Sequence, residues 1–284
     1  METPAIFGRG SSLLGMISTP PVPRQHPVPV LFLNAGILHR VGPHRLHVLL
    51  ARRLAEHGVP SLRFDLGGIG DSNVPESETG SVLDATQRDI DDAISRAVDE
   101  WDAERVVLFG LCSGADVAYE TALIDDRVKA LVQFDPYVYR TPAWYLRHYG
   151  PRVFSARNWI HSLRVRIRAL GSGAGDEGSP DFVAPEYRRV FPPRDQVRKG
   201  MATLMSRGVR MFVCFTGDEP HINHRGQYAQ GLGLPSGALL EVEYVPQADH
   251  TFTHPDHQRW LAARVTRWSR ECFLPEARGG VGVG

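Results

Sequence analysis

The sequence predicts an α/β fold in which helices cover a mostly parallel central sheet. Its 284 residues suffice for one large domain, or for one domain with an insertion. Short apolar runs alternate with segments whose apolar residues recur at helical spacing, a rhythm typical of parallel sheets. A glycine-flanked cysteine, an aspartate and a histidine also follow three of these runs in turn. Together these observations predict a parallel sheet with a reactive site at its strand ends.

The apolar runs are the expected strands, and the helices lie between them. The first strand covers 27–36, and the helix after it, 44–58, ends at Gly58, which suits a helix C-cap. The next strand, 59–66, leads through the loop 67–73 into a long amphipathic helix from about 81 to 101. The remaining elements are strands at 105–110, 128–136, 209–218 and 239–246, and helices at 116–123 and 255–272.

Residues 137–208 break this rhythm. They contain two helical patterns rich in aromatic residues and arginine, 139–150 and 156–170, followed by the glycine-rich stretch 171–180, which has the composition of a mobile loop. We interpret 137–208 as a helical cap inserted into a core formed by 1–136 and 209–284. Such a cap is a natural place to select substrates, with Trp144 and Tyr145 as candidate contacts. Ordinary packing of aromatic helix faces is the alternative.

Composition excludes several kinds of partner. Lys plus Arg and Asp plus Glu are both 32, so no net charge favours nucleic acid or an anionic membrane. The start METPAIFGRG lacks the pattern of a signal peptide, and no apolar run approaches the roughly 20 residues of a membrane helix. The three cysteines form no CxxC pair, which argues against a disulfide framework or a zinc site. We therefore expect a cytoplasmic protein without a cofactor.

The stretch GLCSGA, residues 110–115, has the composition of a strained strand-to-helix turn that presents a nucleophile. The positions two before and two after such a nucleophile must be small, because the turn brings them close to neighbouring backbone. Around Cys112 they are Gly110 and Gly114, whereas around Ser113 they would be Leu111 and Ala115. The spacing predicts Cys112 as the nucleophile. A buried cysteine in a glycine-rich turn is the alternative.

An orienting acid and a base follow in the chain. Asp218 closes the strand 209–218, and His250 stands after the last strand and before the last helix. Cys112, His250 and Asp218 are thus the expected catalytic residues, with Glu219 and Asp135 as alternative acids. Four other histidines near candidate loops lack the placement of His250; they are His221, His224, His254 and His257.

Two backbone amides are expected to stabilise an oxyanion. One is the N–H of Ser113 at the start of the helix after the turn. The other is the N–H of Ile37, in the small-residue turn after the first strand, with Ala35 as the alternative.

The order nucleophile, acid, histidine resembles that of the α/β-hydrolase fold, over about residues 27 to 271. The loop RFDLGGIGDS, 63–72, looks like the D-x-x-G-x-G-x-S loop of its cap-bearing members. Together with NAGILHRVGPHR, GLCSGA and DHTFT, it is similar to a bacterial group with cysteine in the serine's place. That group includes hydrolases associated with exosortase systems, and it resembles more distantly the aminoacyl- and acyltransferases that unload carrier proteins.

The expected function is acyl transfer through a thioester on Cys112, because a thiol exchanges with a thioester donor at little cost in free energy. The donor would be a small acyl compound on a carrier protein or coenzyme A. A hydrolase of an ester, thioester or lactone is the first alternative, and a non-catalytic binding protein is the second.

Two histidine-containing patterns bear on what the site binds. His39, Arg40, His44 and Arg45 form either a cationic mouth for a phosphate or carboxylate or a solvated helix start. His221 and His224 form H-x-x-H beside Asp218, but no third ligand has convincing spacing, so we expect no metal.

Overall fold

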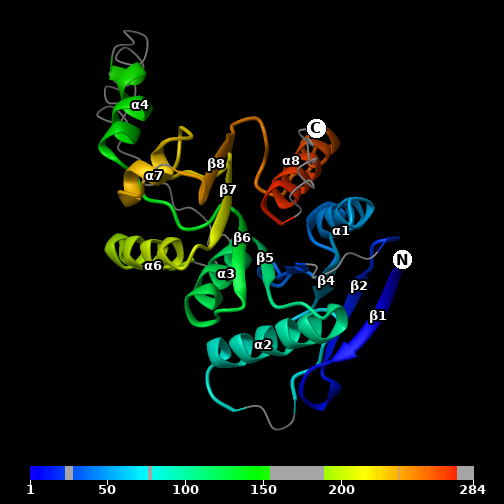
Figure 1. Cartoon of the computed structure of the whole chain (residues 1–284). Helices are drawn as coiled ribbons and strands as arrows, with labels where there is room; N and C mark the ends of the chain where they lie inside the picture. The colour runs from blue at the N-terminus through cyan, green and yellow to red at the C-terminus, as the bar shows by residue number, and fades with distance from the viewer. Residues whose placement is uncertain (23–27, 76–78, 154–188, 236, 274–284) are drawn as a thin grey trace, which may run out of the picture.

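One eight-stranded sheet organises the computed structural model, which describes residues 1–22, 28–75, 79–153, 189–235 and 237–273. The strand order is β1-β2-β4-β3-β5-β6-β7-β8 (Figure 1). The strands are β1 (Glu2–Phe7), β2 (Leu13–Ser18), β3 (Val30–Phe32), β4 (Ser61–Phe64), β5 (Val106–Leu111), β6 (Val128–Phe134), β7 (Arg210–Thr216) and β8 (Leu240–Val245). The six strands from β3 to β8 pair in parallel, which confirms the predicted fold class.

The first two strands are an addition to the expected elements. They form an antiparallel pair that joins the sheet through β2, which is antiparallel to β4. In the fold, buried and half-buried positions alternate at the start of β2, as in a strand with one covered face. The strand is short and closely follows the bend at Gly8 and Gly10, so the local sequence alone does not suggest it.

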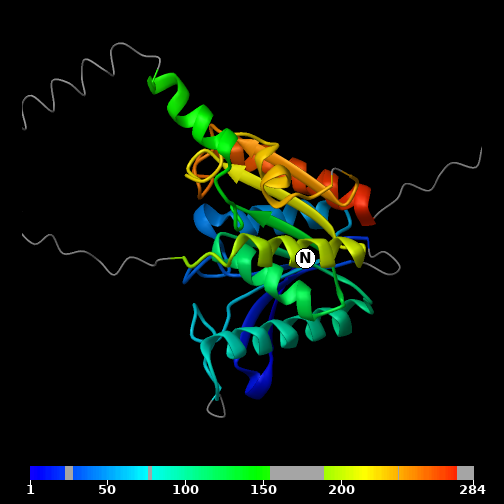
Figure 2. The same ribbon diagram turned by 90° about the vertical axis from the view of Figure 1, so that its left-hand side faces the viewer.

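Two helical layers cover the sheet (Figures 1 and 2). α1 (Leu46–Glu56) and α8 (Pro255–Phe273) pack on one face; α2 (Val82–Trp101), α3 (Ser113–Ile124) and α6 (Arg194–Ser206) pack on the other. Alternate residues of β5 serve the two layers: Val107 and Phe109 face α1 and α8, while Leu108 faces α2 and α3. None of the helices in the described ranges is long and apolar enough to cross a membrane.

The segment 137–208, expected to form a cap, does not stand apart from the core along its whole length. α4 (Pro142–Val153) projects from the body in both views (Figures 1 and 2). α6, in contrast, buries Val197, Met201 and Leu204 in the main core, because its apolar residues recur at helical spacing and face α3. The expected helix 156–170 and loop 171–180 lie outside the described residues, so the division into core and cap stays a prediction.

Candidate active site

Cys112 sits at the apex of a tight turn between β5 and α3. Its backbone has φ 55° and ψ −120°, a conformation that non-glycine residues rarely adopt. A Cβ atom on Gly110 would lie 2.2 Å from the backbone of Gly114, and one on Gly114 would lie 2.5 Å from the carbonyl oxygen of Asn34. Both positions therefore require glycine, and the turn presents the half-buried Cys112 at the carboxyl end of the sheet.

His250 faces Cys112 from the loop after β8. Its Nδ1 lies 2.6 Å from Oδ2 of Asp135, and its ring also shares a hydrogen bond with the side chain of Cys112. The structure thus brings together a thiol, an imidazole and a carboxylate in the order that nucleophilic catalysis uses. The three residues follow β5, β6 and β8, whose carboxyl ends meet at one edge of the sheet.

The carboxylate that holds the His250 ring is Asp135, and the expectation for Asp218 is corrected. Asp218 accepts a hydrogen bond from the backbone N–H of His250 at 3.0 Å and so positions the loop instead of the ring. Asp135 is fully buried, and Thr216 donates its backbone N–H and its hydroxyl to the two carboxylate oxygens, each at 2.8 Å. These donors stabilise the ionised carboxylate beside the imidazole.

This environment changes the protonation of the histidine. The hydrogen bond to Asp135, followed by that to Cys112, raises the pKa of His250 to about 10, against the opposing effect of burial. The ring is therefore protonated at neutral pH. A protonated ring that faces Cys112 can donate a proton to a leaving group.

The loop that carries His250 is fixed from within. Asp249 accepts hydrogen bonds from the hydroxyls of Thr251 and Thr253, each at 2.8 Å. Phe252, at φ 53°, is fully buried and packs edge-on against Phe134, with ring centroids 5.6 Å apart. Since Phe134 ends the strand before Asp135, one contact aligns the histidine loop with the acid.

The amide that reaches the turn from the other side belongs to Gly36, one residue before the expected Ile37. The Gly36 N–H donates to Oγ of Ser113 at 2.8 Å, whereas the Ile37 side chain is 89 % exposed. Ala35, the alternative, is buried in the core. The N–H of Gly36 thus lies beside Ser113, and the oxyanion roles expected for the N–H groups of Ser113 and Ile37 stay predictions.

Asn34 and Asp65 hold the loop that contains Gly36. The Asn34 side chain donates to the carbonyl of Leu38 at 2.8 Å and to Asp65 at 3.2 Å, and it accepts from the N–H of Leu66 at 2.8 Å. This buried network ties the turn after β3 to the loop after β4.

Arg40 and His39 do not form the expected cationic mouth. The Arg40 guanidinium contacts both Asp65 and Asp71, and its side chain is only 12 % exposed. His39 also bonds Asp71, at 3.1 Å. His39, Asp65 and Asp71 are grouped closely enough to ligate a cation, but the Arg40 guanidinium lies among them and forms ion pairs with both carboxylates. These contacts hold the segment after β3, which contains His39 and Arg40, against the loop after β4.

Arg189 is a site residue that sequence reasoning missed. Its guanidinium binds Asp116, with Nε 2.5 Å from Oδ2, and donates to the carbonyls of Asp135 at 2.9 Å and Cys112 at 3.5 Å. The rings of Tyr137 and Phe191 flank it, at 5.2 and 5.0 Å from Cζ. Arg189 thus links the nucleophile turn to the acid loop.

The pKa of Asp116 reflects how little water reaches this part of the site. Burial raises its pKa to about 6, although the hydrogen bond and charge of Arg189 act in the opposite direction. Asp116 lies in the first turn of α3, where an acidic side chain is usually solvated or caps the helix. No local pattern could reveal its partner, because Arg189 is 73 residues away in the chain.

The other candidate residues lie in separate clusters. Glu219 is buried and binds Nδ1 of His221 at 2.7 Å, so it does not contact the His250 ring in the way an alternative acid would. Trp144 is buried against Tyr145 and His148, with ring centroids 5.0 and 4.6 Å away, while Tyr145 is 48 % exposed. A role for Trp144 and Tyr145 in substrate binding stays a prediction.

The sheet order, the strained turn after β5 and the histidine loop after β8 define the α/β-hydrolase fold, which comparison with solved structures bears out. A lidless serine hydrolase from Xanthomonas campestris superposes with a TM-score of 0.56 at 16 % identity, covering 96 % of this chain and 95 % of that one. Est1E from Butyrivibrio proteoclasticus gives 0.56 at 15 % identity, over 94 % and 98 %. A dienelactone hydrolase from Anabaena variabilis gives 0.57 at 14 % identity, over 96 % and 98 %.

No protein-family model and no curated protein matches the sequence. At these identities the structural likeness shows the fold. The chemistry has to be argued from the residues of this chain.

Proposed function

We propose that this protein is a hydrolase that cleaves an ester or thioester through an acyl intermediate on Cys112. The observation that carries the proposal is the strained Cys112 turn facing His250, whose ring is held by buried Asp135. Similarity to solved hydrolases and esterases of the same fold supports it.

In the first half-reaction the Cys112 sulfur attacks the carbonyl carbon of the substrate. The carbonyl oxygen becomes an oxyanion next to the amide of Ser113, and the N–H of Gly36 becomes a second donor when it turns from Oγ of Ser113 to the oxyanion. The bond to the leaving alcohol or thiol breaks, and the His250 imidazolium supplies the proton that this group needs. A thioester between the acyl group and Cys112 remains, with His250 neutral.

In the second half-reaction neutral His250 takes a proton from water, and the resulting hydroxide equivalent attacks the thioester. The acyl group leaves as a carboxylic acid, while Cys112 and His250 return to the thiolate–imidazolium pair. Access for water is consistent with the exposure of His250, whose side chain is 36 % exposed among the described residues.

Mass spectrometry of the intact protein after addition of an acyl N-acetylcysteamine thioester tests this proposal. We expect one acyl group on the wild type and none on Cys112→Ala. Ser113→Ala keeps its backbone N–H and loses only an acceptor for Gly36, so loading should fall by less than about tenfold. Loading that survives in Cys112→Ala and disappears in Ser113→Ala would identify the serine as nucleophile.

Acyl transfer is the second candidate, and the cysteine itself favours it, because exchange between a thiol and a thioester is nearly isoenergetic. The two fates are separated by the decay of the loaded enzyme. Decay to the free acid in buffer at a rate that no amine, alcohol or thiol changes is expected for the hydrolase. A long-lived acyl enzyme that one class of acceptor discharges would identify a transferase.

A further inference from the structure

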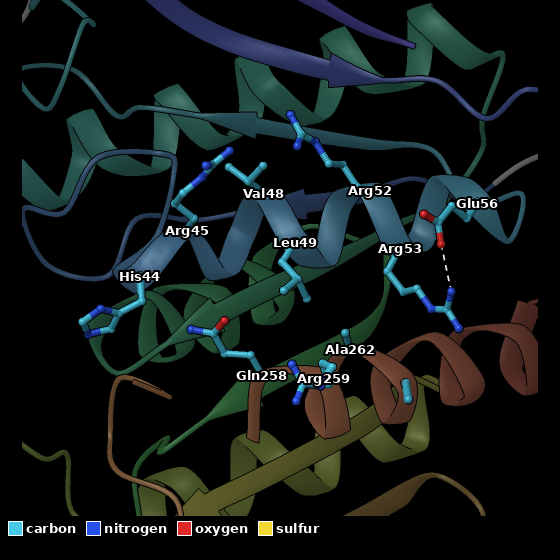
Figure 3. A pocket seen from close by; sticks show the side chains of 11 residues that line it. His44, Arg45, Val48, Leu49, Arg52, Arg53, Glu56, Gln258, Arg259 and Ala262 are labelled. Atoms are coloured by element: carbon cyan, nitrogen blue, oxygen red, sulfur yellow. Dashed lines mark hydrogen bonds and ion pairs between the residues drawn. The ribbon is translucent and has the colours of Figure 1, made fainter. Parts of the chain in front are cut away.

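A cleft of about 700 Å³ runs along the outer side of α1 where this helix packs beside α8 (Figure 3). Four arginines line it: Arg45 directly before α1, Arg52 and Arg53 from α1, and Arg259 from α8. Glu56 is the one acidic side chain among its lining residues, all of which belong to the described part of the chain. The cleft is therefore cationic in a protein whose formal net charge is zero.

The Arg45 guanidinium has no hydrogen bond or ion pair within the described residues, and the residue is exposed. It precedes α1 with φ 63°, directly after His44 at φ 48°, so two consecutive non-glycine residues adopt left-handed backbone there. Such strained backbone concentrates at functional sites. This guanidinium is free to bind an anion.

The other three arginines are paired only at the surface. Arg53 binds Glu56 at 2.8 Å, with the two side chains 47 % and 61 % exposed (Figure 3). Arg259 pairs with Asp256, at 68 % and 67 % exposed. Exposed ion pairs of this kind contribute little stability, so an anion that accepts two hydrogen bonds from one guanidinium can displace the carboxylate.

Arg52 shares its carboxylate with a second arginine. Glu2 accepts from Arg52 at 2.7 Å and from buried Arg63 at 2.5 Å, so one negative charge serves two positive ones. The arginines in and directly behind the cleft therefore outnumber the carboxylates that pair with them.

One end of the cleft adjoins the catalytic loop. His44 lines the cleft, and its Nε2 lies 3.2 Å from Oγ1 of Thr253 and 3.5 Å from Oγ1 of Thr251, one residue after His250. A ligand bound along α1 would thus have one end close to the acylation site.

The spacing of the cations limits the ligand. At about 1.5 Å of rise per residue, Arg45 and Arg53 are roughly 12 Å apart along the helix axis. A single phosphate can meet only one end of this row, whereas a ligand with several separated phosphates can meet both. Val48, Leu49 and Ala262 add an apolar surface on which an aromatic base can rest.

We infer that the cleft between α1 and α8 binds the phosphate-bearing nucleotide end of a coenzyme A thioester, whose acyl end then reaches Cys112. The inference rests on the proposed function for the fate of the acyl group. Binding of the nucleotide end can be measured without any catalysis.

Isothermal titration of the Cys112→Ala protein with coenzyme A and with pantetheine tests the inference. Coenzyme A should bind at least about tenfold more tightly, because guanidinium–phosphate hydrogen bonds are charge-assisted and pantetheine has no phosphate. The combined substitutions Arg45→Gln, Arg53→Gln and Arg259→Gln should remove this difference. Arg267→Gln is the matched control, since Arg267 is exposed on α8 outside the cleft and its replacement should leave binding unchanged.

Equal affinities for coenzyme A and pantetheine would overturn the inference, even if the triple variant failed to fold. So would a folded triple variant that binds coenzyme A as tightly as before, or selective binding of a phosphopantetheine-bearing carrier protein. Failure of the proposed function looks different, because neither the coenzyme A thioester nor the phosphate-free thioester would then load Cys112. Where both load, a preference for the coenzyme A thioester that disappears in the triple variant supports the inference.

Discussion

Three donors converge on the carboxylate of Asp135: the His250 ring and the backbone and hydroxyl of Thr216. This buried group determines which ring nitrogen of His250 faces Cys112, because a carboxylate at Nδ1 keeps a proton there. Asp218, which closes the neighbouring strand, reaches only the backbone of the same residue.

Asp135→Asn should lower the rate of Cys112 acylation by about 10²–10⁴-fold, since loss of the carboxylate removes the main group that keeps the His250 ring protonated and oriented. Asp218→Asn retains an oxygen that can accept from the His250 N–H, so its effect should stay below about tenfold. Pre-steady-state acylation rates of the two variants check this. A larger loss in Asp218→Asn than in Asp135→Asn would refute the assignment from geometry.

The raised pKa of His250 predicts a pH dependence of stability. Because the protonated ring is favoured in the folded chain, its contribution is fully present below the ordinary value of 6.5 and is lost as pH rises toward about 10. The difference in free energy of unfolding between the wild type and His250→Gln should therefore be constant below pH 6.5 and shrink above it. Urea unfolding at several pH values measures it.

Histidine-labelled NMR supplies the control. The His250 ring should titrate near 10 in the wild type and much closer to 6.5 in Asp135→Asn, where its main hydrogen-bond partner is changed. A wild-type His250 ring that titrates near 6.5 would contradict the ion pair between His250 and Asp135, on which the proposed mechanism depends.

At the scale of elements, the first turn of α3 is joined to the segment before α6 by the ion pair of Asp116 and Arg189. Their side chains are 7 % and 14 % exposed, so neither charge has water to replace a lost partner. Arg189 also holds the carbonyls of Cys112 and Asp135, which makes it a positioning residue for the site.

Arg189→Gln should destabilise the protein by about 3–5 kcal/mol, since it leaves a buried carboxylate without its partner. The double variant Arg189→Gln with Asp116→Asn removes that charge and should recover much of the stability. It should not recover the rate of Cys112 acylation, because the two carbonyl contacts are still missing. Thermal unfolding and acylation rates of the single and double variants separate these effects. If the double variant recovers both its stability and its acylation rate, the role of Arg189 is purely structural.

At the scale of the whole molecule, the sheet brings together residues that are far apart in the chain. Cys112, Asp135 and His250 follow strands β5, β6 and β8, and β7 contributes Thr216 between them. The two helical layers leave this edge to loops, while α1 and α8 together form the cationic cleft on one face (Figures 1 and 3). The site and the cleft meet at the contact of His44 with Thr251 and Thr253.

The parallel α/β sheet can be predicted from local sequence alone, because buried strands and amphipathic helices leave periodicities that can be counted. The turn at Cys112 can also be predicted locally, because it requires two glycines. His250 is singled out by its place between the last strand and the last helix. The fold class and the strained turn at Cys112 thus depend on neighbours in the chain.

The choice between Asp135 and Asp218 requires the folded chain, because both show the same local signal of an aspartate at the end of an apolar strand. The choice depends on which carboxylate the His250 ring meets across the strand ends, and this follows from strand order and loop path. Arg189 with Asp116, and the neutralisation of Arg40 by Asp65 and Asp71, are likewise contacts between distant segments. Such pairings have no periodicity in the sequence, because the partners become neighbours only when the chain folds.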